Sequence, residues 1–85
     1  MNYRLVYTHR AVKDVQRLER KVKRRIAKTL VRYSEDPFKY AEKLTDYRLG
    51  TYRFRIGDYR VIFDLEGNDI AILRIGHRKD IYRKL

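Results

Sequence analysis

The chain begins with an alternating pattern of apolar and polar residues and then changes to a helical spacing. Over residues 3–7, Tyr3, Leu5 and Tyr7 form the apolar side, which predicts a strand with one buried face. Thr8 is a suitable N-cap for the helix that follows. The apolar positions beyond it are spaced by three and four, as on one face of a helix. They are Val12, Val15, Leu18 and Val22, followed by Ile26, Leu30 and Tyr33.

The helical segment ends before Asp36-Pro37, because proline disfavours helical geometry in the residue that precedes it. No glycine or proline marks a break inside the segment. We expect a break within Arg20–Lys23, which would give a helical hairpin, although the pattern leaves one long helix open. Residues 38–51 have a mixed pattern and are expected to form a connecting loop, with Leu44 and Leu49 as apolar anchors.

A β-hairpin is predicted on the two sides of Gly57-Asp58. Glycine suits the positive φ that a two-residue turn requires, and this turn would pair Arg55 with Arg60. Directly paired residues project from the same side of a sheet, so the hairpin has one apolar and one cationic face. The apolar face holds Tyr52, Phe54, Ile56, Tyr59, Val61 and Phe63, and the cationic face holds Arg53, Arg55 and Arg60.

The predicted Arg55–Arg60 pair is unfavourable by itself. Like charges directly opposite one another destabilise a sheet by about 0.2–1 kcal/mol, unless an anion lies between them. A local conflict of this kind is expected at a functional site. The alternative interpretation is that these arginines only decorate a solvated face.

An apolar run at residues 70–75 completes the predicted order β-α-α-β-β-β. A two-residue turn before this run would direct Arg74 toward the core. A three-residue bulged loop would instead send Leu73 and Ile75 inward and Arg74 to the cationic face. Because burying an unpaired arginine is costly, we favour the bulged loop.

Composition narrows the class of protein. Eighty-five residues suffice for one domain, 1–85, and the absence of cysteine excludes disulfides and thiolate metal sites. No apolar run approaches the ~18 residues of a membrane span, and the strand-like start does not resemble a signal peptide, so we expect a soluble cytoplasmic protein. The net charge of +11 favours a polyanionic partner, nucleic acid before an acidic membrane.

Two motifs resemble those of the RelE/ParE superfamily of toxins: Tyr52–Phe63 and Ile75–Tyr82. The resemblance covers essentially the whole chain and is strongest to the RelE branch. It implies a RelE-like α+β fold, with a small twisted antiparallel sheet and a helical hairpin packed on one face. It also implies a type II toxin that cleaves mRNA in the ribosomal 30S A site, needs no metal or cofactor, inhibits translation and is neutralised by a cognate antitoxin.

The resemblance also implies roles for individual residues. The basic residues before the turn correspond to Arg53 and Arg55, and the phosphate-binding arginine after it to Arg60. The basic residues after the last strand are His77 and Arg78, and the C-terminal tyrosine is Tyr82. Some members carry lysines in place of Arg53 and Arg55. Since arginine cannot act as a general base near neutrality, the acid–base assignment stays open.

Metal-independent RNA cleavage needs a group that removes the 2′-OH proton, cations on the phosphate, and a donor to the 5′ oxygen. Guanidinium groups suit the phosphate, histidine suits proton transfer, and tyrosine can stack on a base. The expected catalytic residues are Arg55, Arg60, His77, Arg78 and Tyr82. Further RNA contacts are expected from Arg53, Arg74, Lys79, Arg24 and Arg25.

His77 and Tyr82 could also have purely structural roles. His77 could be a strand-end histidine bonded to backbone, and Tyr82 could simply pack on the sheet. The aspartates at 58, 64 and 80 do not have the spacing of a metal-ligand set. Two other functions remain: a ParE-like inhibitor of DNA gyrase that cuts no RNA, and a non-catalytic basic module that binds nucleic acid.

Overall fold

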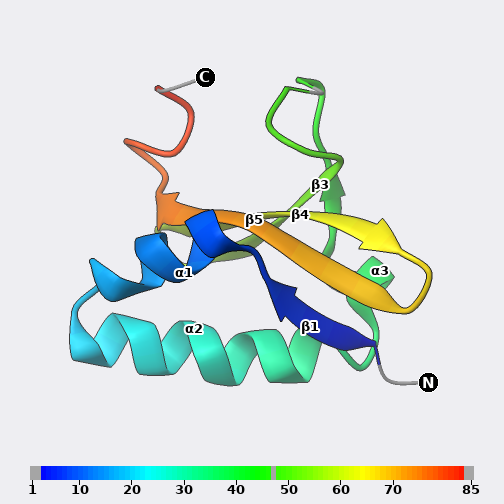
Figure 1. The fold of residues 1–85 in the computed structure, drawn as a ribbon, viewed down its shortest axis with the longest axis horizontal. Helices are drawn as coiled ribbons and strands as arrows, with labels where there is room; N and C mark the ends of the chain where they lie inside the picture. Colours follow the sequence, from blue (N-terminus) through cyan, green and yellow to red (C-terminus); the bar gives the residue numbers. More distant parts are fainter. Residues whose placement is uncertain (1–2, 47, 84–85) are drawn as a thin grey trace.

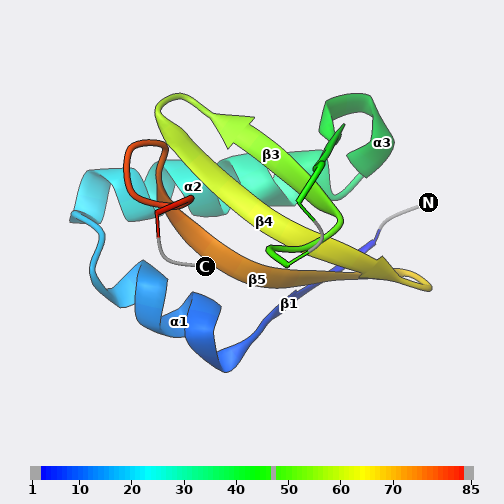
Figure 2. The ribbon, with the colours of Figure 1, turned by 90° about the horizontal axis from the view of Figure 1, so that it is seen from above.

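The computed structural model describes residues 3–46 and 48–83, which form a five-stranded sheet with helices on one face (Figure 1). The elements are β1 (Arg4–Tyr7), α1 (His9–Gln16), α2 (Arg20–Tyr33), α3 (Pro37–Tyr40), β2 (Glu42–Lys43), β3 (Tyr52–Ile56), β4 (Tyr59–Glu66) and β5 (Asp69–His77). Seen from above, α2 lies under β3 and β4, and α1 lies beside β5 (Figure 2). Within the described residues, no helix has the length and apolar character needed to cross a membrane.

The strand order is β1-β5-β4-β3-β2. The pairs among β2, β3, β4 and β5 are antiparallel, but β1 runs parallel to β5, with Arg4 opposite Asp69 and Tyr7 opposite Ile72. The expected α+β fold with its helical hairpin on one face is confirmed, and the sheet is mixed instead of purely antiparallel. The helical hairpin crosses one face, so the first strand can pair with the last.

The predicted apolar face of the β3–β4 hairpin packs on the helices. Phe54 and Phe63 are fully buried and stack at a centroid distance of 4.2 Å. Ile26 and Leu30 of α2 belong to the same buried cluster. Complete burial of such a side chain contributes about 1.5–3 kcal/mol, so this cluster is the main source of stability.

The helical region is a hairpin with a break at residues 17–19, just before the segment in which we expected it. Leu18 keeps its apolar contact with the core although it lies between the helices, so the periodic pattern runs through the break and conceals it. Thr8 is confirmed as the N-cap of α1. Its Oγ1 accepts a hydrogen bond from the Ala11 N–H at 3.3 Å and donates to the Ile72 carbonyl at 2.7 Å.

The segment expected to be a loop contains α3 and the two-residue β2. Pro37 occupies the first turn of α3, where its missing N–H does no harm. In β2, Glu42 pairs with Arg53 of β3. The two expected anchors, Leu44 and Leu49, do pack, in a second apolar cluster on the face opposite the helices.

The register of the hairpin is confirmed, with Arg55 opposite Arg60 and Ile56 opposite Tyr59. The favoured three-residue loop between β4 and β5 is wrong, because Glu66 pairs with Asp69 across a two-residue turn. We favoured that loop because a two-residue turn would direct Arg74 toward the core. A bulge later in β5 avoids this. Phe63 pairs with Ile72 and Ile62 with Arg74, so Leu73 has no partner in β4.

The bulge changes which residues of β5 face the core. Ile75 is buried with the helices, as expected. Leu73 packs instead with the second cluster, on the opposite face, where we had expected it to point inward.

Candidate functional site

The face of the sheet opposite the helices is partly cationic and partly apolar. Ile62 projects from it beside the arginines and is fully buried with Leu44 and Ile81. The loop before β3 and the chain after β5 both rise over this face (Figure 1). The sequence pattern predicted the arginines but not this apolar cluster, because its members come from three distant segments.

A glutamate joins the arginines of β3. Glu42 Oε1 accepts a hydrogen bond from Arg53 Nε at 3.0 Å, and its Oε2 lies 3.7 Å from Arg55 Nη1. Arg53 Nη1 also donates to the Tyr82 hydroxyl at 2.8 Å. The bond with Tyr82, supported by Glu42, raises the pKa of Arg53 above its usual value, although partial burial acts in the opposite direction.

Arg60 is held at the β3–β4 turn. Its Nη1 donates to the carbonyl oxygens of Gly57 and Tyr59, both at 2.9 Å, and the residue is only 6% exposed. These carbonyls stabilise its charge, so the pairing of Arg60 with Arg55 does not itself require a bound anion. The Arg55 side chain is 57% exposed, and among the described residues its only ion pair is the long contact with Glu42.

Two further arginines approach the same turn. The Arg78 N–H donates to the Asp58 carbonyl at 2.8 Å, and its Nε lies 3.7 Å from the Asp58 carboxylate. Arg25 of α2 lies so close that a Cβ built on Gly57 would be 2.7 Å from its Nη2. Arg25, Arg60 and Arg78 thus gather around one turn, whereas Arg24 lies exposed on α2.

His77 lies on the other side of the sheet from Arg53 and Arg55. It pairs with Tyr59, whose ring meets the histidine ring edge-on at 5.4 Å. Its Nδ1 accepts a hydrogen bond from the Lys79 N–H at 3.1 Å, which matches the backbone-bonded alternative. We had expected His77 to share one site with the arginines, and the structure separates them, because Tyr59 and Arg60 project from opposite faces.

Arg74 does not extend freely over the cationic face. Its Nε donates to Asp14 Oδ2 at 2.8 Å, and the same carboxylate oxygen accepts the Ile75 N–H at 2.9 Å. β1 pairs with β5 only as far as Ile72, so Asp14 supplies an acceptor for the edge of β5 beyond that point. Asp14 and Arg74 therefore attach α1 to the sheet.

Glu42 is the residue that sequence reasoning missed. It lies eleven positions before Arg53, in a segment without periodicity, and only the pairing of β2 with β3 brings the two together. Tyr82 packs against the apolar cluster, which is one of the alternatives that we considered, and its hydroxyl also accepts a hydrogen bond from Arg53, which we had not expected. Among residues 3–46 and 48–83, no group of histidine and acidic side chains could hold a metal ion.

The fold and this face define a class of protein: a small basic α+β domain, with a helical hairpin on one side of a sheet and an arginine cluster on the other. A family model described as the ParE toxin of the type II toxin–antitoxin system parDE matches residues 5–82. The chain belongs to this family, within the RelE/ParE superfamily of toxins.

Individual relatives agree with this assignment. Toxin RelG of Mycobacterium tuberculosis (strain ATCC 25618 / H37Rv) is 32% identical over 91 residues, which cover 99% of this chain and 100% of the relative. The archaeal RelE–RelB complex from Pyrococcus horikoshii OT3 contains a chain that is 30% identical with a TM-score of 0.73, covering 94% of this chain and 99% of that one. The toxin–antitoxin complex RelBE2 from Mycobacterium tuberculosis shares the fold, with a TM-score of 0.83 at 23% identity over 92% of this chain and 100% of that one.

Proposed function

We propose that this toxin is a ribosome-dependent, metal-independent endoribonuclease that cleaves mRNA in the 30S A site and so inhibits translation. One observation carries the proposal: Arg53 and Arg55 of β3 share a face with Glu42 and Tyr82, and Arg60 lies directly opposite Arg55. Cleavage by a 2′-OH requires a group that accepts the 2′ proton, cations on the phosphate and a donor that protonates the departing 5′ oxygen. Glu42, the arginines and the Tyr82 hydroxyl can supply these three functions in turn.

Arg55 is the best placed residue to bind the reacting phosphate. Its side chain is more than half exposed, and its contact with Glu42 is long enough, at 3.7 Å, to be exchanged for a phosphate oxygen. Arg60 is fixed by the turn carbonyls and supplies a preorganised positive charge next to it. Arg78 can add a guanidinium group from the other side of the turn.

Glu42 is our candidate for the group that removes the 2′-OH proton. The arginines cannot accept a proton near neutral pH, and His77 lies on the other face of the sheet. The Glu42 carboxylate bridges Arg53 and Arg55 and so lies beside the phosphate site. Tyr82, fixed by Arg53, is suited to stack on a neighbouring base.

A cognate antitoxin is the partner that controls such a toxin in the cytoplasm. Several structurally similar chains were solved within RelE–RelB or RelBE toxin–antitoxin complexes, which supports this part of the proposal. The arginine face is the surface that an antitoxin would have to cover or distort to prevent cleavage.

The test is primer extension on a reporter mRNA after the purified protein is added to a translating extract. Arg55→Ala and Glu42→Gln should each reduce cleavage within translated codons by about 100-fold or more, because each removes a group that acts on the transition state. Arg20→Ala removes an exposed arginine at the start of α2, on the helical side of the sheet, and is the matched control.

Codon cleavage that persists in folded Arg55→Ala would contradict the site. The match to the ParE family model favours a second function, inhibition of DNA gyrase without RNA cleavage. DNA breaks in cells that express the toxin, with intact mRNA, would establish that alternative.

A further inference from the structure

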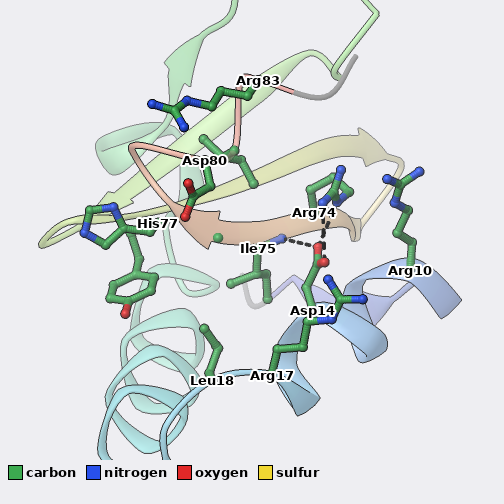
Figure 3. Close-up of a pocket in the computed structure, with 12 residues that line it drawn as sticks. Arg10, Asp14, Arg17, Leu18, Arg74, Ile75, His77, Asp80 and Arg83 are labelled. Atoms are coloured by element: carbon green, nitrogen blue, oxygen red, sulfur yellow. Dashed lines mark hydrogen bonds and ion pairs between the residues drawn. The ribbon is translucent and has the colours of Figure 1, made fainter.

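A separate pocket lies between α1 and the end of β5. It has a volume of about 660 Å³ and is lined by side chains from α1, from β4 and β5, and from the turn after β5 (Figure 3). Its size is in the range of pockets that bind small molecules or single nucleotides. Arg53, Arg55 and Glu42 do not line it, although Ile81 of the second apolar cluster does.

Positive charge exceeds negative charge in this pocket. Four arginines and two aspartates line it. One of the aspartates, Asp14, is already neutralised by Arg74 and bonded to the Ile75 N–H. Arg10 and Arg17 are exposed and form no ion pair with any other described residue. Two guanidinium groups without a carboxylate partner, at the edge of a hollow, are suited to an anionic group of a ligand.

The pocket continues along α1. A smaller hollow of about 300 Å³ shares Arg10, Asp14, Arg17 and Arg74 with it and adds His9 and Lys13. The two hollows form one groove, which we call the α1–β5 groove. An elongated cationic groove fits a chain of phosphates better than a single small anion.

The opposite wall of the pocket is aromatic and apolar. The rings of Tyr59 and His77 both line it and meet edge-on. Leu18 and Ile75 also line it, and His77 lies on the far side of the pocket from Arg10 (Figure 3). Aromatic rings beside arginines are the combination that proteins use for single-stranded nucleic acid, with the base on the rings and the phosphate on the cations. An acidic peptide could satisfy the arginines but would offer nothing flat to the rings.

We propose that the α1–β5 groove binds a nucleotide of single-stranded RNA, with its phosphate on Arg10 and Arg17 and its base against Tyr59 and His77. This inference rests on the proposed function, because it identifies a second contact for the same RNA. Gly76, the neighbour of His77, pairs with Arg60. A strand that leaves the arginine face can therefore pass over the end of β5 into the groove.

The experiment is an NMR titration of the ¹⁵N-labelled protein with adenosine 5′-monophosphate, which contains no bond that a ribonuclease could cleave. Amide signals of Leu18, Ile75 and His77 should shift in the parent protein. Inorganic phosphate should shift only signals near the arginines, and adenosine should bind more weakly than the monophosphate.

Two double variants distinguish specific binding in the groove from general attraction of the nucleotide to a positively charged protein. Arg10→Ala with Arg17→Ala should weaken binding by about 10-fold or more, because both phosphate contacts are lost. Arg20→Ala with Lys21→Ala removes the same charge outside the groove and should change binding by less than about 2-fold at moderate salt. Thermal unfolding of each variant verifies that it is folded.

Equal weakening in the two double variants would overturn the inference, as would shifts confined to the Arg53–Arg55 face. Shifts produced by a glutamate-rich peptide but not by the monophosphate would identify a peptide groove instead and would also overturn it. Failure of the monophosphate to bind, with Arg55-dependent mRNA cleavage intact, rejects the groove alone. Binding without any cleavage rejects the proposed ribonuclease and leaves a nucleotide site.

Discussion

At the scale of single residues, the turn glycines Gly57 and Gly67 have the same backbone conformation but different neighbouring side chains. Gly57 and Gly67 have nearly equal φ values, 59° and 60°. A Cβ on Gly57 would lie 2.7 Å from Arg25, whereas one on Gly67 would meet nothing within 4 Å. The two positions therefore share the conformational cost of a side chain but differ in steric surroundings.

We expect Gly67→Ala to lower the free energy of unfolding by about 1–2 kcal/mol, the cost of a left-handed residue with a side chain. Gly57→Ala should lower it by a similar amount, because the guanidinium that its Cβ would meet is the far end of the exposed, flexible Arg25 side chain and can move away at little cost. Urea unfolding measures both values. A much larger loss for Gly57→Ala, which Arg25→Ala relieves in the double variant, would contradict this and show that Arg25 is held against the turn.

The repulsion expected between Arg55 and Arg60 is relieved by the position of the Arg60 guanidinium. Arg55 and Arg60 do face each other, yet Arg60 turns its guanidinium to the carbonyls of its own turn. The like-charge pair therefore persists without a ligand. Only Arg55 keeps an exposed cation for a substrate on this strand pair.

At the scale of elements, Asp14 is the main polar link between α1 and β5. Asp14→Ala would leave the Ile75 N–H and the Arg74 guanidinium without their acceptor, where the Arg74 side chain is only 21% exposed. We expect the free energy of unfolding to fall by about 2–4 kcal/mol, the cost of unpaired groups in a largely buried position. Urea denaturation followed by circular dichroism measures it.

Asp80→Ala is the matched control for that variant. Asp80 lines the same pocket but is exposed, and its carboxylate bonds to no other described side chain. Its removal should change stability by less than about 0.5 kcal/mol. Similar losses in the two variants would show that Asp14 does not attach the helix.

At the scale of the whole molecule, the parallel pairing of β1 with β5 joins two segments that are far apart in the sequence. Arg4 donates to both carboxylate oxygens of Asp69, 65 residues away, at 2.9 and 3.0 Å. The hydrogen bonds from Arg4 lower the pKa of Asp69. This pair forms only when the sheet is complete.

The ion pair between Arg4 and Asp69 should make the free energy of unfolding depend on pH. Because the pKa of folded Asp69 lies below its unfolded value of about 3.9, the contribution is present above that pH and is lost as pH falls through the folded value. Asp69→Asn should therefore lose less stability than the parent between neutral and strongly acidic pH. Urea midpoints over this pH range give the comparison.

Asp46→Asn serves as the control for Asp69→Asn. The pKa of Asp46 is also lowered, by hydrogen bonds from the Arg48 side chain, but the partners are only two positions apart. Such a local pair can persist in the unfolded chain and so contributes little to the difference between the two states. An equal change in the two variants would contradict a long-range role for the Arg4–Asp69 pair.

The sequence by itself determined the features that depend on near neighbours. Thr8 as N-cap, the end of α2 before Pro37 and the pairing of Arg55 with Arg60 follow from local hydrogen bonds, proline geometry and a two-residue turn. The apolar side of the hairpin follows from strand alternation. These signals act over a few residues, so they can be read directly.

Only the tertiary structure decided how the distant segments meet. Three of these features join segments that are far apart in the chain: β1 with β5, Glu42 with Arg53, and Arg74 with Asp14. The pairing of β4 with β5 likewise places His77 on the other face of the sheet from the arginines. The bulge at Leu73 also follows from packing, because it lets Ile75 reach the core while Leu73 packs on the opposite face. Such contacts depend on how whole elements pack, and no local pattern records them.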